Sequence, residues 1–310
     1  MLLTKKDILE GLNEDQKEAV INYTGPCFVV AGPGSGKTRT IISRAAYMIS
    51  EGIKPENILM FTFTNKAAGE IRERIENLIG DDARGITVGT YHSICSRLLR
   101  KYAEYLGYRS NFSIYDDEDK LKVLKEIVDT DNIKCELVGK YISRWKERLV
   151  SPSSAILNAK KSIEAIAAEY YQVYQKELKK RNVFDFDDLI YMTIKLMRDF
   201  PEVKEKINRR FQYVISDEYH DSSRADVELI KLLAGDHNNI CLILDDEQSI
   251  YSFRGSDLDA VLSVTDYFSD MKTFVLRRNY RSTKRIIQAA RSVIANNSGQ
   301  IKKEIFTENE

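Results

Sequence analysis

The sequence predicts an α/β fold in which a parallel sheet is covered by helices and interrupted by a helical insertion. Three observations support this prediction. Short apolar runs alternate with helical patterns over the first 93 residues, helical patterns alone follow up to residue 210, and three further apolar runs come after them. Strands that alternate with helices are typical of a parallel sheet covered on both faces.

The first 93 residues predict three strands, each leading into a helix. Asn13 and Gln16 have capping-box spacing, so a helix is expected to begin there, with Leu12 entering it and Ala19 and Val20 facing inward. The strands are predicted in CFVVA (27–31), ILMFTF (58–63) and ITVGT (86–90).

Residues 94–210 predict a helical insertion without a convincing strand. Its clearest helical patterns lie at 118–129, 162–180 and 185–200. Strands resume at 212–218, 239–246 and 272–278, so we expect the sheet to be completed after the insertion. The expected domains are residues 1–93 with 211–281, residues 94–210, and a C-terminal stretch of residues 282–310.

The composition is that of a soluble globular protein with reduced thiols. Lys plus Arg equals Asp plus Glu at 47 each, so any nucleic-acid surface has to be a local patch. The four cysteines form no CxxC pair and there are only three histidines, which argues against a structural zinc site. Without a secretory segment or a long apolar run, we expect a cytoplasmic protein and no membrane partner.

The segment AGPGSGKT is typical of a phosphate-binding loop, because it lies between a predicted strand and a predicted helix. Backbone N–H groups there can surround phosphates at a helix N-terminus. Lys37 is expected to reach the β and γ phosphates, and the Thr38 hydroxyl to bind Mg²⁺. The loop comprises Ala31, which replaces the usual glycine, Gly32, Pro33, Gly34, Ser35, Gly36, Lys37 and Thr38.

Two adjacent carboxylates, Asp217 and Glu218, end the apolar run VIS. Alone, they fit a solvated turn as well as a catalytic pair. If this run and residues 27–31 form neighbouring strands, Asp217 lies beside Thr38 and can hold Mg²⁺ through water. Glu218 can then accept a proton from the water that attacks the γ phosphate.

Seven segments in order resemble the motifs of the superfamily 1 DNA helicases of the UvrD, PcrA and Rep type. They are LNEDQKEAV, AGPGSGKTR, FTFTNKAA, GTYHS, DEYHD, QSIYSFRG and LRRNYRS. The predicted insertion falls where that family inserts a helical subdomain into its first motor domain. The resemblance implies a RecA-like P-loop NTPase fold, the cofactors ATP and Mg²⁺, and 3′ to 5′ translocation or unwinding on single-stranded DNA or single/double-strand junctions.

The resemblance also implies roles for side chains around the nucleotide. Gln16 matches the glutamine that binds the adenine edge, and its capping position is compatible with that role. Arg39 and Tyr280 match residues that flank the base. Gln248 matches the γ-phosphate sensor, and Arg281 an arginine that reaches the same phosphate, with a surface ion pair as the alternative. The catalytic residues implied are Lys37, Asp217, Glu218, Gln248 and Arg281.

Three groups of residues match DNA contacts of that family. Aromatic rings stack on unpaired bases with roughly 1–3 kcal/mol per base, and short polar side chains hold phosphates. Core packing is the alternative for the aromatic residues, and a satisfied polar role for the histidine. The groups are Phe63, Thr64 and Asn65, then Thr90 and His92, then Tyr251, Phe253 and Arg254.

The sequence departs from the family near the expected γ phosphate. His220 stands where the family has glutamine, Leu244 where it has glycine, and Glu247 where it has aspartate. These changes put turnover or its stimulation by DNA in doubt, but not nucleotide binding.

The chain ends about 30 residues after Arg281, where the family's second motor domain begins. We therefore interpret it as the first motor domain of a helicase, with weak activity of its own. Two alternatives stay open: the motor portion of a helicase–nuclease subunit, and a nucleotide-switched DNA-binding module without efficient turnover.

Overall fold

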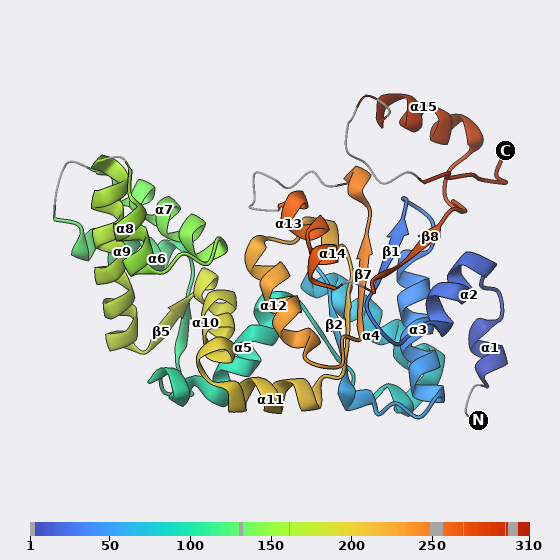
Figure 1. Cartoon of the computed structure of the whole chain (residues 1–310), viewed down its shortest axis with the longest axis horizontal. Coiled ribbons are helices and arrows are strands. Elements are labelled where there is room, and N and C mark those ends of the chain that lie inside the picture. Colours follow the sequence, from blue (N-terminus) through green and yellow to red (C-terminus); the bar gives the residue numbers. More distant parts are fainter. Residues whose placement is uncertain are drawn as a thin grey trace. The chain divides into compact units, whose positions relative to one another are not determined.

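A six-stranded parallel sheet forms the centre of the first of two compact units (Figure 1). The computed structural model describes residues 4–129, 133–160, 162–248, 257–268, 270–294, 296 and 303–310. Unit 1 comprises Met1–Thr90, Glu205–Ser222 and Leu233–Glu310, and unit 2 comprises Tyr91–Lys204 and Ser223–Leu232.

The strands of unit 1 follow the order β3-β2-β6-β7-β1-β8, and all neighbours are parallel. All six predicted strands are confirmed. They are β1 (Cys27–Ala31), β2 (Ile58–Phe61), β3 (Thr87–Gly89), β6 (Tyr213–Ser216), β7 (Ile240–Leu244) and β8 (Lys272–Leu276). The strand order also shows that the sheet is completed after the insertion, as predicted.

The helices of unit 1 include the predicted first helix, α2, in which Asn13 and Gln16 form a capping box. Leu12, Ala19 and Val20 are buried, as expected. The elements are α1 (Lys5–Leu9), α2 (Glu14–Ile21), α3 (Lys37–Ser50), η1 (Pro55–Asn57), α4 (Asn65–Ile79), η2 (Gly80–Ala83), η4 (Tyr219–Asp221), η5 (Asp246–Gln248), α13 (Leu258–Leu262), α14 (Val264–Tyr267) and α15 (Lys284–Ile294). In Figure 1, α15 and the C-terminus lie beyond the carboxyl ends of β1 and β7.

The core of unit 1 lies between the sheet and α2, α3 and α4. Ile41 and Ala45 of α3 and Ile71 of α4 pack there against alternate residues of β1, such as Val29. The remaining β1 residues are buried as well, as expected for a parallel strand covered on both faces. Each fully buried aliphatic side chain contributes roughly 1.5–3 kcal/mol, so this core fixes the strand ends relative to one another.

Unit 2 is mostly helical, with a second small sheet. Its core lies between α6, α7 and α9 and includes Val123, Ile142 and Tyr171. The elements are α5 (Tyr91–Tyr102), η3 (Ala103–Leu106), β4 (Ser113–Tyr115), α6 (Asp117–Ile127), α7 (Cys135–Glu147), α8 (Pro152–Asn158), α9 (Ser162–Arg181), β5 (Val183–Asp185) and α10 (Phe186–Asp199). The helices α11 (Pro201–Arg210) and α12 (Arg224–Ala234) contribute residues to both units.

One prediction for the insertion is wrong, because β4 and β5 are strands. They pair in parallel, with Ile114 opposite Phe184. Each has only three residues, which is too short for the alternation of polar and apolar residues that identifies a strand in a sequence.

Residues 282–310, expected to begin a further domain, belong to the compact unit 1 in this structure. The four cysteines form no disulfide in this structure, and three of them are buried while Cys135 is partly exposed. In the described part of the chain, the helices are too short or too polar to cross a membrane.

Candidate nucleotide-binding site

The segment between β1 and α3 forms a loop at the carboxyl edge of the sheet, where parallel α/β sheets bind ligands. Gly34 and Gly36 have φ values of 71° and 85°, which residues with a Cβ rarely adopt. The Ser35 backbone N–H and hydroxyl both donate to the Gly32 carbonyl, at 3.3 and 2.8 Å. The loop therefore leads into α3 with the helix N-terminus open to an anion.

Gln16 of α2 stabilises this loop through a side-chain hydrogen bond. Its Nε2 donates to the Ser35 carbonyl at 3.0 Å, and its Oε1 accepts from the Asn13 backbone N–H at 3.1 Å. A Cβ on Gly36 would lie 2.6 Å from Gln16 Nε2. The capping interpretation of Gln16 is thus confirmed, and its role at an adenine stays a prediction.

The strand order corrects the expected position of Asp217. The strands β1 and β6 are not neighbours, because β7 lies between them and pairs with both. The carboxylate that follows the neighbouring strand is Asp245, which is fully buried. Asp217 follows β6, one strand further away, so the expected neighbourhood of these two strands is wrong, while the role of Asp217 toward Mg²⁺ stays a prediction.

Glu218 nevertheless reaches the loop lysine. Lys37 Nζ lies 3.8 Å from Glu218 Oε2 and 3.7 Å from Asp245 Oδ2. Glu218 has a left-handed backbone with φ of 50°, a strained conformation that turns the chain sharply after β6. Its backbone N–H donates to Asp217 Oδ1 at 3.0 Å. The three side chains Lys37, Glu218 and Asp245 therefore converge at the mouth of the loop.

Asp217 is a buried carboxyl, and within the described part of the chain it forms no ion pair, although the Lys37 ammonium group acts on it from a greater distance. Its backbone N–H donates to the Phe61 carbonyl at 2.9 Å, which ties the end of β6 to β2. Burial and the neighbouring Glu218 carboxylate raise the pKa of Asp217 to about 7. A bound divalent cation would favour the ionised form and offset the unfavourable burial of this charge.

The site fits a nucleotide with Mg²⁺ on two further observations. The cradle has no room for side chains at its glycines, since a Cβ on Gly34 would lie 2.6 Å from Arg281 Cβ. Glu218 Oε2 is buried and has no hydrogen-bond partner among the described residues. Over that same part of the chain, no three His, Cys, Asp or Glu residues cluster as a complete metal site, so phosphate oxygens and water would supply most Mg²⁺ ligands.

Asp245 forms hydrogen bonds with three polar side chains, those of His220, Gln248 and Lys303. Its backbone N–H donates to His220 Nδ1 at 3.2 Å, and its Oδ2 accepts from Gln248 Nε2. Its Oδ1 accepts from Lys303 Nζ. The sequence analysis does not single out Asp245, although the apolar run LIL followed by two aspartates repeats the pattern that identified Asp217.

The three departures from the family lie around Asp245. His220 is buried, and burial lowers its pKa, so the imidazole is neutral and accepts through Nδ1. Leu244 is fully buried in β7 and pairs with Val30 of β1. Glu247 Oε1 lies 3.7 Å from Lys303 Nζ.

Asn279 is a second residue that the sequence analysis does not single out. It is buried, donates from Nδ2 to the Pro33 carbonyl at 2.5 Å, and accepts from the Arg281 backbone N–H at 2.8 Å. The next residue, Tyr280, donates from its backbone to the Gly34 carbonyl at 2.9 Å. This segment after β8 thus also holds the loop, and it contacts the start of α2 through Tyr280 and Asn13.

The predicted base-flanking residues lie near these anchors. Tyr280 is 45% exposed, and its hydroxyl accepts from Asn13 Nδ2 at 2.9 Å. Arg39 and Arg281 are exposed, and Thr38 is half-buried in the first turn of α3. Their roles toward a nucleotide stay predictions.

The predicted DNA residues of unit 1 lie at the same edge of the sheet. Phe63 follows β2 and is 45% exposed, while Thr64 caps α4 by accepting from the Ala67 backbone N–H at 3.1 Å. Asn65 begins α4, and Thr90 follows β3. Tyr251, Phe253 and Arg254 lie outside the described residues.

His92, the remaining predicted DNA residue, belongs to unit 2. Its ring stacks on Phe186 with centroids 3.9 Å apart and planes at 16°. Burial lowers the pKa of His92 to about 4, so the imidazole is neutral at physiological pH. The stack accounts for His92 as a packed ring, and its DNA contact stays a prediction.

Comparisons with known proteins agree with this geometry. A family model described as the UvrD/REP helicase N-terminal domain matches residues 12–269. The chain is 40% identical over 309 residues to the ATP-dependent DNA helicase PcrA of Staphylococcus epidermidis. The aligned region covers 97% of this chain and 42% of the relative. It is 41% identical over 309 residues to the protein of the same name from Staphylococcus aureus, with the same shares covered. The chain thus spans less than half the length of these relatives.

Proposed function

The chain belongs to the UvrD/REP helicase family through its N-terminal domain, and we propose that it is the first motor domain of an ATP-dependent DNA helicase or translocase. The proposed ligands are ATP, Mg²⁺ and single-stranded DNA or single/double-strand junctions. The names of the PcrA relatives support ATP use and DNA as the substrate. The 3′ to 5′ direction is proposed from the family resemblance.

The observation that supports this proposal most strongly is the convergence of two carboxylates on Lys37 at the mouth of the loop. Lys37 Nζ lies 3.8 Å from Glu218 Oε2 and 3.7 Å from Asp245 Oδ2. A cation beside two acidic strand ends suits the γ phosphate and its attacking water, because phosphoryl transfer depends on positioning and charge stabilisation.

Each residue of the loop and the strand ends has a role in this proposal. The loop backbone and Lys37 bind the phosphates. Thr38 and Asp217 would hold Mg²⁺, which supplies charge neutralisation on the phosphate oxygens when bound. Glu218 accepts the proton of the attacking water, because its Oε2 has no hydrogen bond to give up. Gln248 and Arg281 are proposed to contact the γ phosphate.

DNA is proposed to lie along the carboxyl edge of the sheet. The exposed ring of Phe63 suits stacking on a base. Contacts with phosphates are proposed for Thr64, Asn65 and Thr90, which lie after the ends of β2 and β3. This mode of binding is independent of sequence.

The test is a titration of the 310-residue chain with ATP and Mg²⁺, with and without a single-stranded oligonucleotide, following melting temperature and phosphate release. We expect the nucleotide to raise the melting temperature, and the release of phosphate measures how far this chain turns ATP over. Lys37→Ala should abolish the nucleotide-dependent stabilisation, whereas Lys122→Ala, at an exposed lysine of α6, should leave it unchanged. Equal stabilisation of Lys37→Ala and wild type would exclude the proposed phosphate site.

A further inference from the structure

Lys303 is a buried cation within the acidic turn that follows β7. Its Nζ lies 2.5 Å from Asp245 Oδ1 and 2.8 Å from Asp246 Oδ1, and the side chain is 1% exposed. Burial alone would lower the pKa of Lys303, but the hydrogen bonds that it donates to the carboxylates of Asp245 and Asp246 raise it above its ordinary value. The lysine is therefore charged, and it neutralises part of the acidic turn.

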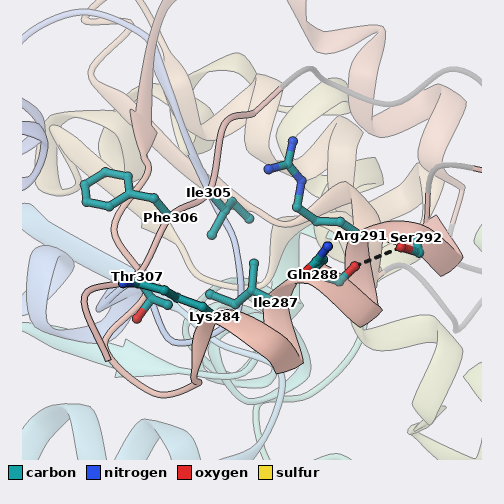
Figure 2. A pocket seen from close by; sticks show the side chains of 8 residues that line it. All are labelled: Lys284, Ile287, Gln288, Arg291, Ser292, Ile305, Phe306 and Thr307. Atoms are coloured by element: carbon teal, nitrogen blue, oxygen red, sulfur yellow. Dashed lines mark hydrogen bonds between the residues drawn. The ribbon is translucent and has the colours of Figure 1, made fainter. Parts of the chain in front are cut away.

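The segment of residues 303–308 is pinned beside the phosphate loop. The Phe306 backbone N–H donates to the Arg277 carbonyl at 3.0 Å, and the Asn279 backbone N–H donates to the Phe306 carbonyl at 2.8 Å. Ile305 packs against Gly32 of the loop. Ile305, Phe306 and Thr307 line a pocket together with residues of α15 (Figure 2). The backbone that follows Lys303 is therefore fixed by Phe306, and the ammonium group of Lys303 is fixed by its two ion pairs.

The two oxygens of the Asp245 carboxylate have different partners. Oδ1 accepts from Lys303, while Oδ2 accepts from Gln248 and lies 3.7 Å from Lys37 Nζ. A fully buried carboxylate is unfavourable without a cation. If Lys303 were absent, Lys37 would be the nearest described ammonium group able to compensate Asp245.

We infer that Lys303 is a positioning residue of the proposed nucleotide site. Lys303 neutralises the buried charge of the Asp245 carboxylate, so that Lys37 stays available to a phosphate. The carboxylate, held in place by Lys303, in turn fixes the orientation of Gln248. Lys303 acts through Asp245 and touches no substrate itself. This inference rests on the proposed function and adds a determinant 266 positions from Lys37 in the chain, supplied by the segment that follows α15.

The test is a double-mutant cycle on the whole chain, with Lys303→Met, Asp245→Asn and the combined variant. Affinity for ATP with Mg²⁺ and the melting temperature without nucleotide are measured for each. Lys303→Met should weaken ATP binding about tenfold, a coupling of ordinary size between two sites. In the Asp245→Asn background the same change should alter affinity less than about threefold, because the carboxylate that competes for Lys37 is gone.

Lys303→Arg keeps the positive charge and should recover most of the lost affinity. Equal ATP affinity of Lys303→Met and wild type would overturn the inference. A loss of ATP affinity of about tenfold on adding Lys303→Met to Asp245→Asn would overturn it as well. This comparison can be made even if Lys303→Met alone does not fold. Absence of ATP binding by the wild-type chain would refute the proposed function and this inference together.

Discussion

His220 connects two strand ends through a single hydrogen bond. Its Nδ1 accepts from the backbone N–H of Asp245, which is buried in the turn after β7. The family glutamine at this position has a carbonyl oxygen that can accept the same bond. The departure therefore keeps the hydrogen-bond acceptor and changes mainly the rigidity of the side chain.

We predict that His220→Gln retains the stability of the wild type, whereas His220→Leu lowers the free energy of unfolding by about 1–3 kcal/mol. The leucine leaves the Asp245 N–H buried without an acceptor, which costs the desolvation of that group. Urea unfolding of both variants measures the difference. Equal stability of the two variants would show that the hydrogen bond contributes nothing.

His92 predicts a pH dependence of the stability of unit 2. Burial lowers its pKa from about 6.5 to about 4, so the folded state binds the proton less tightly than the unfolded state. The stabilisation is complete above pH 6.5 and is lost as the pH falls through 4. The loss amounts to roughly 3 kcal/mol over this range.

His92→Phe keeps a ring on Phe186 and should remove this part of the acid destabilisation. Between pH 7.5 and 4, the unfolding free energy of the variant should therefore fall by roughly 3 kcal/mol less than that of the wild type. His237→Phe, at an exposed position, is the matched control. An unchanged acid slope in His92→Phe would exclude the histidine as its source.

At the scale of elements, the phosphate loop depends on one glycine that the flanking helix α2 confines. A Cβ at Gly36 would meet Gln16 Nε2 at 2.6 Å, and its φ is 85°. Gly69, in the exposed middle of α4, would meet nothing within 4 Å. The two glycines therefore respond in opposite ways to the same substitution.

Gly36→Ala should lower the free energy of unfolding by about 1–3 kcal/mol and weaken ATP binding, because both backbone strain and the contact with Gln16 oppose it. Gly69→Ala should raise stability by about 0.5–1 kcal/mol, since it adds a better helix former without a clash. Thermal unfolding with and without ATP separates the two effects. A stable, ATP-binding Gly36→Ala variant would contradict the close packing of the loop.

The local elements of this fold are predictable from the sequence, and the strand order is not. CFVVA followed by GPGSGKT indicates strand, loop and helix because the pattern is continuous in the chain. Whether β6 or β7 lies beside β1 depends on packing between segments more than 180 residues apart in sequence. For that reason the sequence leaves open which carboxylate follows the strand beside β1, and the structure shows that it is Asp245.

Site residues that the sequence does not indicate also depend on contacts between distant segments. Asn279 and Lys303 are unremarkable residue types in their local segments, and they gain a role only where the chain returns to the loop and the β7 turn. The strands β4 and β5 are a further case, since three residues give no usable pattern and their pairing spans 70 positions. Contacts between distant segments, more than local propensity, limit the prediction.

At the scale of the whole molecule, the two units have separate hydrophobic cores and different polar networks. Unit 2 buries Lys146 between Asp185 at 2.7 Å and Asp188 at 2.8 Å. Asp185 also caps α10 through its contact with the Asp188 backbone N–H. Removing Lys146 would take the nearest cation from both buried carboxylates and leave Asp185 with Lys120 at 3.7 Å. The nucleotide ligand, by contrast, is proposed to bind unit 1.

We therefore predict that Lys146→Met and ATP act on different thermal transitions. The substitution should lower the free energy of unfolding of unit 2 by about 3–5 kcal/mol, the usual effect of breaking a buried ion pair. By calorimetry, one transition should fall by more than about 10 °C, and a second should still rise when ATP and Mg²⁺ are added. Lys122→Ala, at an exposed ion pair of the same unit, should move neither. A single transition that responds to both changes would mean that the units unfold cooperatively, so that a mutation in the helical insertion also weakens the nucleotide site.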